Sequence, residues 1–487
     1  MYRSRLKGKL DKDALKFLSS ISDDLALLYY DIVGSEAHSV MLYENGLIKQ
    51  QELKKILNAL EGVKKQDLKK LASEEYEDIH EAVEAYVVEK AGMDSGGKMH
   101  TARSRNDQVA LDIRMKIRDD INDICREMLA LIDTLVKKAE QNKDSAMIMY
   151  THLQHAQIGT FSHYLLSYAD ALFRDLDRLY ICYGRVNQSP LGACAIGGTS
   201  IKIDRRKTAS LLGFDSLVEN SIDATTARDF MVEFCFDLAM IMLDLSRIAE
   251  DFVLWSSSEF NYVELADEFT SSSSVMPQKK NPCPLELMRA KASMSLGLLM
   301  SLMGTVKSLP SGYSRDLQDT KHILWQSISI AKDSLKLMRF IIESLKVNKK
   351  IMFESAQNSY AVSLDIAEEL VKKGIAFRQA HKIVGSLVKT ASDSKKSLAA
   401  LNEQEIKSVI GKDFPAEELA KIIKSVDPKS SLEARVSLGS PNPKEQERMI
   451  SDRKLKANGY RKGIEKRAKQ VSDAFDSLEK NVRSQLS

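Results

Sequence analysis

The chain has 487 residues, enough for two or three domains or for one elongated helical scaffold. Its 71 basic and 68 acidic residues nearly cancel, which argues against a protein that binds nucleic acid or a membrane surface through its overall charge. The 5 cysteines form no CxxC pair and no apolar run is long enough to span a bilayer, so we expect a cytoplasmic protein without disulfides or a zinc site.

The first predicted unit, residues 1–107, is charged and helical and ends at the glycine-rich stretch 92–97. The second, residues 108–353, contains long segments without proline, the residue that breaks helices. Between 113 and 135, and again between 230 and 252, apolar residues recur at intervals of three and four, the period of one helical face. The sequence therefore predicts a long central helical bundle.

The segment 230–252 is apolar on its other faces as well, where Met231, Met240 and Leu243 lie. A helix that is apolar all round is surrounded by neighbours, and other subunits are one source of them. Methionines at helical spacing are far more often part of a core than of a cofactor site, so we expect this helix to be buried.

The third predicted unit, residues 354–487, is rich in lysine and contains short amphipathic helices such as 365–373, which Gly374 ends. Its charged tail, about 445–487, is also helix-prone, and its interleaved acidic residues favour a solvated helix over a nucleic-acid contact. Strand-like alternation is scarce apart from 201–203. The expected fold class is therefore all-α, in a protomer of three domains.

The stretch 270–281 reads TSSSSVMPQKKN and differs from the helical segments on both sides of it. Serine hydroxyls compete for backbone groups and proline removes a donor, so these residues do not suit a helix interior. A loop rich in hydroxyls, with two lysines and held between rigid helices, suits chemistry on an anionic substrate. We expect this catalytic loop to span residues 270–283.

Polar residues gather in a few islands between the helices. These are 100–108 (HTARSRNDQ), 151–157 (THLQHAQ), the serine loop through Glu286, and 309–321 (LPSGYSRDLQDTK). Each has an ordinary explanation: residues 103–106 could cap a helix and pair with surface carboxylates, Thr151 and His152 could start a helix, and Lys279 and Lys280 could be solvated. Together they supply anion-binding donors and a few proton carriers, without a metal cluster or a nucleotide-binding loop.

Several of these segments resemble a known family. The serine loop, SSSVMPQKKNP from Ser272 to Pro282, resembles the GSSxMPxKxNP signature of the fumarase/aspartase superfamily. With HTARSRNDQ, YTHLQHAQ, NSIDATTARDF and PSGYSRDLQDTK, the chain is similar over about residues 15–440 to the argininosuccinate lyase family, which includes the delta-crystallins. The resemblance implies an all-helical protomer with a long central bundle, assembled as a homotetramer with a multi-helix core. Each active site would draw segments from three subunits, without a cofactor or a metal.

The resemblance also implies an activity, the reversible β-elimination of argininosuccinate to fumarate and L-arginine, the last step of arginine biosynthesis. On the same basis Ser273 and His152 transfer the protons, Glu286 pairs with the histidine, and Lys279 and Asn281 hold the carboxylate where negative charge develops. Whether the histidine or a serine oxyanion is the base stays open, with a slight preference for the serine. The substrate-binding residues implied are Ser20, Arg103, Ser104, Asn106, Thr151, Tyr313, Gln318 and Lys321.

Three positions depart from the family pattern, because Ser272 and Ala102 replace glycines and Ile158 stands where proline is usual. If a replaced glycine had positive φ, a side chain there would cost on the order of 1 kcal/mol or more. Arg103 and Arg105 are equally open as carboxylate binders or as ion pairs at a subunit interface.

Two other functions are compatible with the sequence. One is another fumarate-producing lyase of the superfamily, such as adenylosuccinate lyase, although those enzymes usually place histidine where Gln278 stands. The other is a non-enzymatic, crystallin-like structural protein. All the proton carriers and charge-binding residues implied by the resemblance are present, which favours an enzyme.

Overall fold

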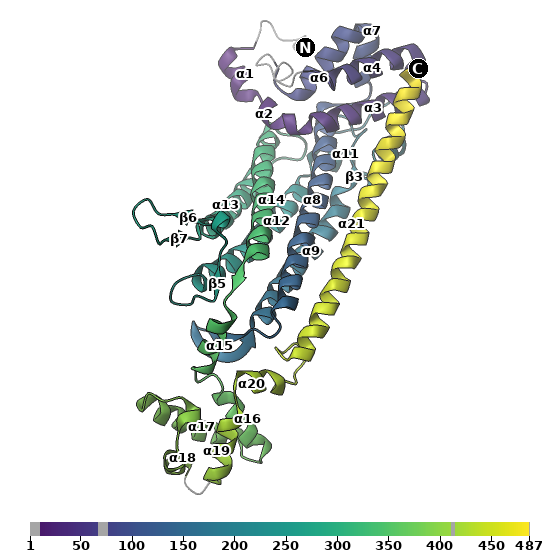
Figure 1. Cartoon of the computed structure of the whole chain (residues 1–487). Coiled ribbons are helices and arrows are strands. Elements are labelled where there is room, and N and C mark those ends of the chain that lie inside the picture. Colours follow the sequence, from purple (N-terminus) through teal and green to yellow (C-terminus); the bar gives the residue numbers. More distant parts are fainter. Residues whose placement is uncertain (1–9, 67–75, 411–413, 487) are drawn as a thin grey trace.

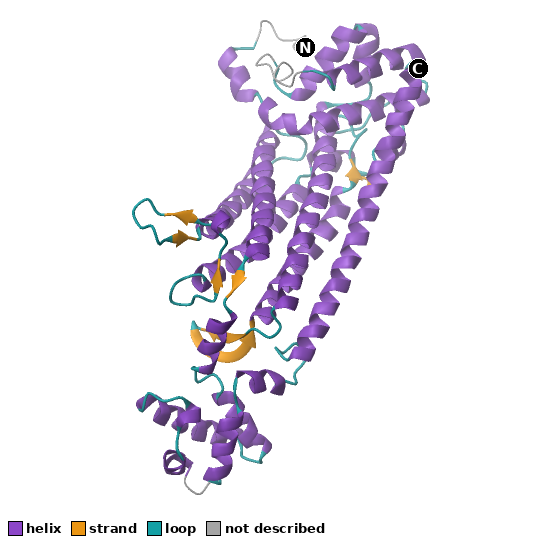
Figure 2. Ribbon diagram, viewed as in Figure 1, coloured by secondary structure: helices purple, strands orange, loops and turns teal. Residues whose placement is uncertain are grey.

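The computed structural model describes residues 10–66, 76–410 and 414–486, which form an elongated and almost entirely helical molecule (Figure 1, Figure 2). A group of N-terminal helices lies across one end of a long bundle, and a smaller group of helices lies at the other end (Figure 1). The expected all-α class with a long central bundle is therefore confirmed.

The N-terminal helices surround α3, which crosses the end of the bundle (Figure 1). They are α1 (Lys12–Leu18), α2 (Ile21–Asp24), η1 (Leu25–Leu27), α3 (Leu28–Glu44), α4 (Gln50–Val63), α6 (Ile79–Ala91), α7 (Met93–Gly96) and η2 (Gly97–His100). Gly92, with a φ of 78°, ends α6, so the glycine-rich stretch does stop a helix. The short helices α7 and η2 then continue the chain to the start of the bundle.

Five long helices form the bundle, and shorter ones flank it. The long helices are α8 (Arg105–Gln141), α9 (Phe161–Val186), α12 (Asp229–Trp255), α13 (Cys283–Val306) and α14 (Thr320–Ser344). The short ones are α10 (Arg205–Leu211), α11 (Ser221–Thr226), η3 (Asp267–Phe269), η4 (Arg315–Asp319) and α15 (Lys349–Gln357). Both segments predicted from apolar spacing are confirmed, because 113–135 lies inside α8 and 230–252 inside α12.

The remaining helices form the far end of the molecule and its longest helix. They are α16 (Ser363–Lys372), α17 (Phe377–Asp393), η5 (Leu398–Ala400), α18 (Glu403–Ile410), α19 (Ala416–Ser425), α20 (Pro428–Ala434) and α21 (Pro443–Leu486). The predicted helix 365–373 corresponds to α16, and Gly374 follows it with a φ of 93°. The helical tail is also confirmed, as α21.

Buried side chains form three main clusters, in the bundle, in the N-terminal helices, and in α16 to α19. Helix α21 packs along α8 and α9, and its last turns, at Leu478 and Val482, enter the N-terminal cluster. It therefore runs the length of the bundle (Figure 1), and among the described residues it contributes no side chain to the third cluster. The domain boundaries at 107 and 353 stay a prediction. No helix in the described ranges is long and apolar enough to cross a membrane.

In the described ranges strands are few and short, and each pairs with one other strand. The pairs are β1 (Ala146–Thr151) with β2 (Gln154–Thr160), β3 (Gln188–Ser189) with β4 (Ser216–Leu217), β5 (Val263–Glu264) with β8 (Lys346–Val347), and β6 (Ser271–Ser272) with β7 (Lys280–Asn281). One expectation is wrong, and one alternative that the sequence left open is excluded. Residues 201–203 pair with no strand, and Ile203 instead packs on the N-terminal cluster. Thr151 and His152 start no helix, because the β1–β2 ladder holds this backbone and buries Ile158 opposite Ile148.

Candidate active site

Three predicted substrate-binding residues lie together where α2 meets the start of α14. Ser20 donates its hydroxyl to Asp24 Oδ2 at 2.6 Å. The Lys321 ammonium donates to Ser20 Oγ at 3.2 Å and forms a close ion pair with Asp24 Oδ1. Gln318 donates its side-chain amide to the Leu18 carbonyl at 2.9 Å. The fold thus creates a buried carboxylate–ammonium pair, of which sequence reasoning found the lysine and missed Asp24.

Tyr313 and Arg228 extend this cluster. Burial raises the pKa of the Tyr313 phenol, against the opposing charge of Arg228. Arg228 is only 2% exposed and donates to the carbonyls of Thr225 and Ala227, and burial lowers its pKa to about 10. Arg228 comes from NSIDATTARDF, a segment that supported the resemblance but supplied no predicted site residue. A charged side chain within a segment that matches the family was the feature of the sequence that could have identified Arg228 as a site residue.

The segment before α8 approaches the same cluster. Arg105 Nε lies 3.2 Å from Asp78 Oδ2, and although burial opposes it, the charge of Arg105 lowers the pKa of Asp78. Ser104 is the N-cap residue of α8, and its hydroxyl accepts the N–H of Asn106 at 3.3 Å. Asn106 donates its side-chain amide to the Ala195 carbonyl at 3.0 Å. Ser104 therefore caps a helix, as its ordinary explanation predicts, and Arg105 pairs with a carboxylate of its own chain. A role for Arg105 at a subunit interface or with the substrate stays a prediction.

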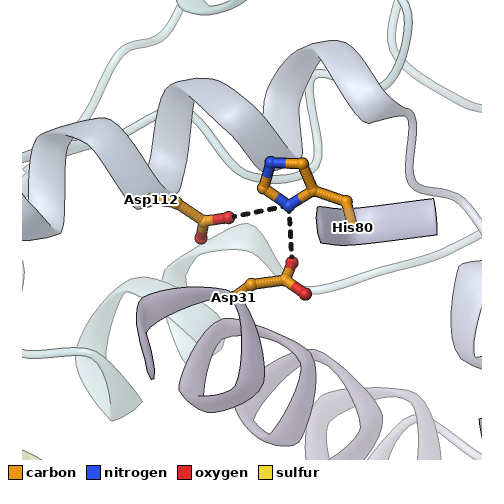
Figure 3. Close-up of side chains that lie close together, drawn as sticks. All are labelled: Asp31, His80 and Asp112. Carbon is orange, nitrogen blue, oxygen red and sulfur yellow. Dashed lines mark hydrogen bonds and ion pairs between the residues drawn. The ribbon is translucent and has the colours of Figure 1, made fainter. Parts of the chain in front are cut away.

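Arg103 differs from its neighbours because it is buried and lies beside a buried network of Asp31, His80 and Asp112. His80 Nδ1 lies 3.0 Å from Asp31 Oδ1 and 3.4 Å from Asp112 Oδ2 (Figure 3). These ligand atoms are close enough to hold a metal ion, but the Arg103 guanidinium already supplies a positive charge to the two carboxylates. We therefore interpret the trio as a structural network that joins α3, α6 and α8.

The pKa values of the two carboxyl groups in this network are shifted in opposite directions. Burial and the nearby Asp31 charge raise the pKa of Asp112 well above its usual value. For Asp31 burial is the largest single influence and also raises the pKa, but the charge and hydrogen bond of His80 together with the charges of Arg103 and Arg105 outweigh it, and the pKa falls to about 2. Burial thus disfavours the charged form of Asp112, whereas the nearby positive charges favour the charged form of Asp31.

Ala102 carries the backbone strain that its departure from glycine implied. Its φ is 56°, in the left-handed region that glycine adopts without cost. We expect Ala102→Gly to raise the free energy of unfolding by about 0.5–1 kcal/mol, because relief of strain exceeds the added freedom of the unfolded chain. Chemical denaturation of the two proteins at equal concentration measures this difference, and a less stable variant would contradict the assignment of strain.

The other two departures carry no such cost. Ser272 lies in β6 and is not among the described residues with positive φ. Ile158 lies inside β2, fully buried and opposite Ile148. Proline in its place would remove a donor from the strand ladder, so isoleucine suits this hairpin.

His38, which contacts the backbone of the segment before α8, makes the folding stability depend on pH. It is fully buried, its ring Nε2 donates to the Thr101 carbonyl at 2.8 Å, and burial lowers its pKa from 6.5 to about 3. The unfolded chain therefore binds more protons between those values, so stability is complete above pH 6.5 and is lost as pH falls. For this histidine we expect a loss of about 2 kcal/mol between pH 6.5 and pH 5.

The variant His38→Gln tests this dependence, because its amide keeps a donor but takes up no proton. We expect urea midpoints of the variant to change less between about pH 7.5 and pH 5 than those of the parent. Equal changes in both proteins would assign the acid sensitivity to other groups.

Thr151 and His152 lie at the tip of the β1–β2 hairpin. Thr151 pairs with Gln154, which leaves a two-residue turn of His152 and Leu153 with φ values of 55° and 56°. Positive φ at both central residues is the type I′ geometry, which favours asparagine and glycine. With histidine and leucine the turn is strained by on the order of 1 kcal/mol per residue. Sequence reasoning missed this hairpin because its turn lacks the usual residues.

Ser273 lies in the loop of the β6–β7 hairpin, which projects from the side of the bundle (Figure 1). Its Oγ accepts the backbone N–H groups of Val275, at 3.3 Å, and of Met276, at 3.0 Å. Two amide donors on one hydroxyl oxygen stabilise negative charge on that oxygen. The ionised form of Ser273 is therefore more stable than that of a serine whose hydroxyl contacts only water.

The two lysines of the serine loop have different surroundings. Lys280 Nζ lies 3.2 Å from Glu264 Oε1 and 2.7 Å from Asp267 Oδ1, so it holds the base of the hairpin and is not simply solvated. Lys279 is exposed and makes no side-chain hydrogen bond or ion pair with any residue that the structure describes. Of the two, Lys279 is therefore the one available to a substrate anion.

The predicted site residues occupy three separate places in one chain. The first group lies near α2, the second on the β1–β2 hairpin beside α15, and the third on and after the β6–β7 hairpin (Figure 1). In that third group Asn281 lies in β7, and Glu286 is exposed in the first turn of α13. Within the described parts of the chain, no hydrogen bond or ion pair joins one group to another. A single chain therefore does not bring His152 and Ser273 into contact.

The sequence matches known families and relatives along almost its whole length. A family described as "Lyase" matches residues 4–297, and one described as "Argininosuccinate lyase C-terminal" matches residues 360–433. The chain is 51% identical over 483 residues to an argininosuccinate lyase from Nitrosopumilus maritimus, with 99% of each chain covered. Identity to the argininosuccinate lyase of Methanocaldococcus jannaschii is 39% over 478 residues, with 98% of each covered.

Solved structures agree with this assignment of fold. A variant of EDDS lyase with bound fumarate has a TM-score of 0.87 and 28% identity, covering 99% of this chain and 97% of that one. A class II fumarase from Schistosoma mansoni has a TM-score of 0.71 and covers 84% of this chain and 91% of its own. At 16% identity this second likeness concerns the fold alone.

Proposed function

This chain belongs to the argininosuccinate lyase family, and from that premise we propose how its residues perform the family's reaction. The reaction is the reversible β-elimination that cleaves argininosuccinate into fumarate and arginine. A base removes a proton from the carbon beside a carboxylate, and the electron pair of that C–H bond forms the C=C bond of fumarate. The C–N bond to the guanidinium group breaks, and an acid supplies a proton to the leaving nitrogen.

Ser273 is the base in this proposal. The observation that supports it best is the pair of amide N–H groups on Ser273 Oγ, because they stabilise the oxyanion that removes the proton. The neighbouring Lys279 adds positive charge to the same loop. His152, exposed at the tip of its hairpin, protonates the leaving nitrogen, and Glu286 orients the imidazole.

The two ends of the substrate have different binding groups. Lys279 and Asn281 hold the carboxylate on which negative charge develops, and donors preorganised in this way contribute about 3–4 kcal/mol each to such a transition state. The buried pair of Asp24 and Lys321, with Ser20 hydrogen-bonded to both, suits the amino acid end of arginine. A carboxylate there meets the α-ammonium group, and an ammonium meets the α-carboxylate.

Other residues of the three groups complete the site. Tyr313 and Gln318 add a hydroxyl and an amide beside the buried pair, and Thr151 adds a hydroxyl next to the histidine. Asn106 is positioned on the first turn of α8 by the Ser104 cap. The buried Arg103 donates to the Ser35 hydroxyl at 2.9 Å. In this proposal it therefore holds the segment before α8 in place and does not contact the substrate. No cofactor or metal takes part in the proposed reaction.

Association of chains completes the site, and the assembly is a homotetramer in which three subunits contribute to each site. Support comes from α13, where apolar side chains between 47% and 66% exposed follow one another; they are Leu287, Met294, Leu296, Met300 and Met303. The adjacent α12 leaves Phe236 and Leu243 exposed as well. A continuous apolar surface of this kind is typical of a subunit interface. Burial of these faces would produce the multi-helix core that the family resemblance implies.

The compartment proposed for this activity is the cytoplasm. All five cysteines are free, and three of them are buried among apolar side chains, which fits a reducing compartment.

Hybrid assemblies test the shared site. Ser273→Ala and His152→Asn chains are expected to be inactive alone, with argininosuccinate as substrate and fumarate absorbance as readout. When the two variants are co-expressed under different tags and purified as hybrids, activity should reappear, because some sites then combine an unaltered serine with an unaltered histidine. Hybrids of proven mixed composition that stay inactive would contradict a site shared between chains.

A further inference from the structure

Apolar side chains stand exposed beside both proposed proton carriers. Leu153, which follows His152, is 72% exposed. Val275 and Met276, two and three residues after Ser273, are 82% and 43% exposed. Apolar side chains that lie next to one another at the surface, as Val275 and Met276 do, are a feature of sites that contact another molecule.

Leu153 is also held in a strained backbone conformation. Its φ of 56° is one that glycine would adopt freely in the same two-residue turn. In a single chain the exposed leucine offers no packing in exchange for that strain. Strain kept at such a position is explained if the side chain makes a contact in the assembled protein.

We propose that Leu153 of one chain packs against Val275 and Met276 of a second copy, and that this apolar latch holds His152 and Ser273 on one substrate. The inference rests on the proposed function. If both proton carriers act on neighbouring atoms of one molecule, residues one to three positions away along each chain lie in the same region of the assembly, since each residue spans at most about 3.8 Å. Apolar contact at that point excludes water from the reacting groups.

A second copy of this chain is the partner that the surroundings favour. The serine loop leads directly into α13, whose exposed apolar residues form the proposed subunit interface, so the loop tip continues that surface. Lys280 fixes the base of the β6–β7 hairpin and leaves its tip free. Beside Leu153 opens a cavity of about 890 Å³, with Tyr150 and Phe260 in its wall, which gives room for an incoming methionine side chain.

The variant Leu153→Gly separates this role from a structural one. Because glycine suits the turn, the melting temperature should stay equal or rise, while kcat falls about tenfold or more and KM stays within about threefold. Val275→Ser should lower kcat to a similar degree. In the double variant the losses should not multiply, because both changes remove the same contact. The matched control is Val436→Ser, which alters a side chain that is 94% exposed outside the site and should leave kcat unchanged.

Other outcomes overturn the latch without touching the proposed function. A Leu153→Gly enzyme with kcat within about twofold of the parent, or a double variant whose loss is the product of the single losses, shows that no such contact exists. If Leu153→Gly lowers the melting temperature, the variant Leu153→Asn is measured in its place, because asparagine also suits the turn. The same changes in kcat and KM are then expected. Ser273→Ala and His152→Asn remain inactive in either case, so active forms of those variants would refute the proposed function itself.

Discussion

Replacing Ser273 with alanine or His152 with asparagine is expected to lower kcat by about 100- to 10,000-fold, the usual cost of removing a positioned acid or base. Each variant lacks one of the two groups that move protons in the elimination, and no other described side chain of the serine loop or the hairpin turn accepts the two amide donors that Ser273 holds. KM should change much less, because neither group supplies the main charges that bind the substrate. Fumarate absorbance with argininosuccinate measures both constants.

The chain offers matched controls for both substitutions. Ser274 is the next residue in the same loop and is exposed, and His155 lies on the same hairpin three residues after His152. Ser274→Ala and His155→Asn should therefore retain most of the activity. Turnover close to the parent in Ser273→Ala or His152→Asn, with the assembly intact by size-exclusion chromatography, would refute the assignment of that residue.

The long helices were predictable because their signal is local. In α12 the apolar residues of 230–252 repeat at the helical period, which predicts a helix with a buried face, and the structure buries that face. The β1–β2 hairpin was not predictable in the same way. His152 and Leu153 form a turn whose geometry usually requires asparagine and glycine, so the motif looked like the start of a helix. The turn therefore departs from its usual residue preference at His152, a predicted catalytic residue.

Contacts between distant segments account for what the sequence could not show about the site. Asp24 stands 297 residues before Lys321, and nothing in its own neighbourhood distinguishes it from the adjacent Asp23. The buried network of Asp31, His80 and Asp112 likewise joins three helices that are separate in sequence. Motif resemblance located the residues near α2, whereas their partners became evident only when the chain was folded.

The buried pair at the end of the bundle predicts the largest effect on stability. Lys321→Met should lower the free energy of unfolding by about 3–5 kcal/mol, because it leaves the Asp24 carboxylate without a cation in the protein interior. Asp24 is 0% exposed and Lys321 3% exposed, so water screens neither charge. Removing both charges in Asp24→Asn with Lys321→Met should restore most of the lost stability, since breaking a buried pair costs more than replacing it.

The same variants separate stability from substrate recognition. Urea denaturation at fixed protein concentration gives the free energies, and Lys389→Met is the control, because its pair with Asp393 is exposed and should matter by less than about 1 kcal/mol. If the buried pair binds the amino acid end of the substrate, the double variant should recover its stability and still have a strongly raised KM. A double variant with normal KM would make the pair purely structural, and a Lys321→Met variant as stable as the parent would show that Asp24 finds another cation.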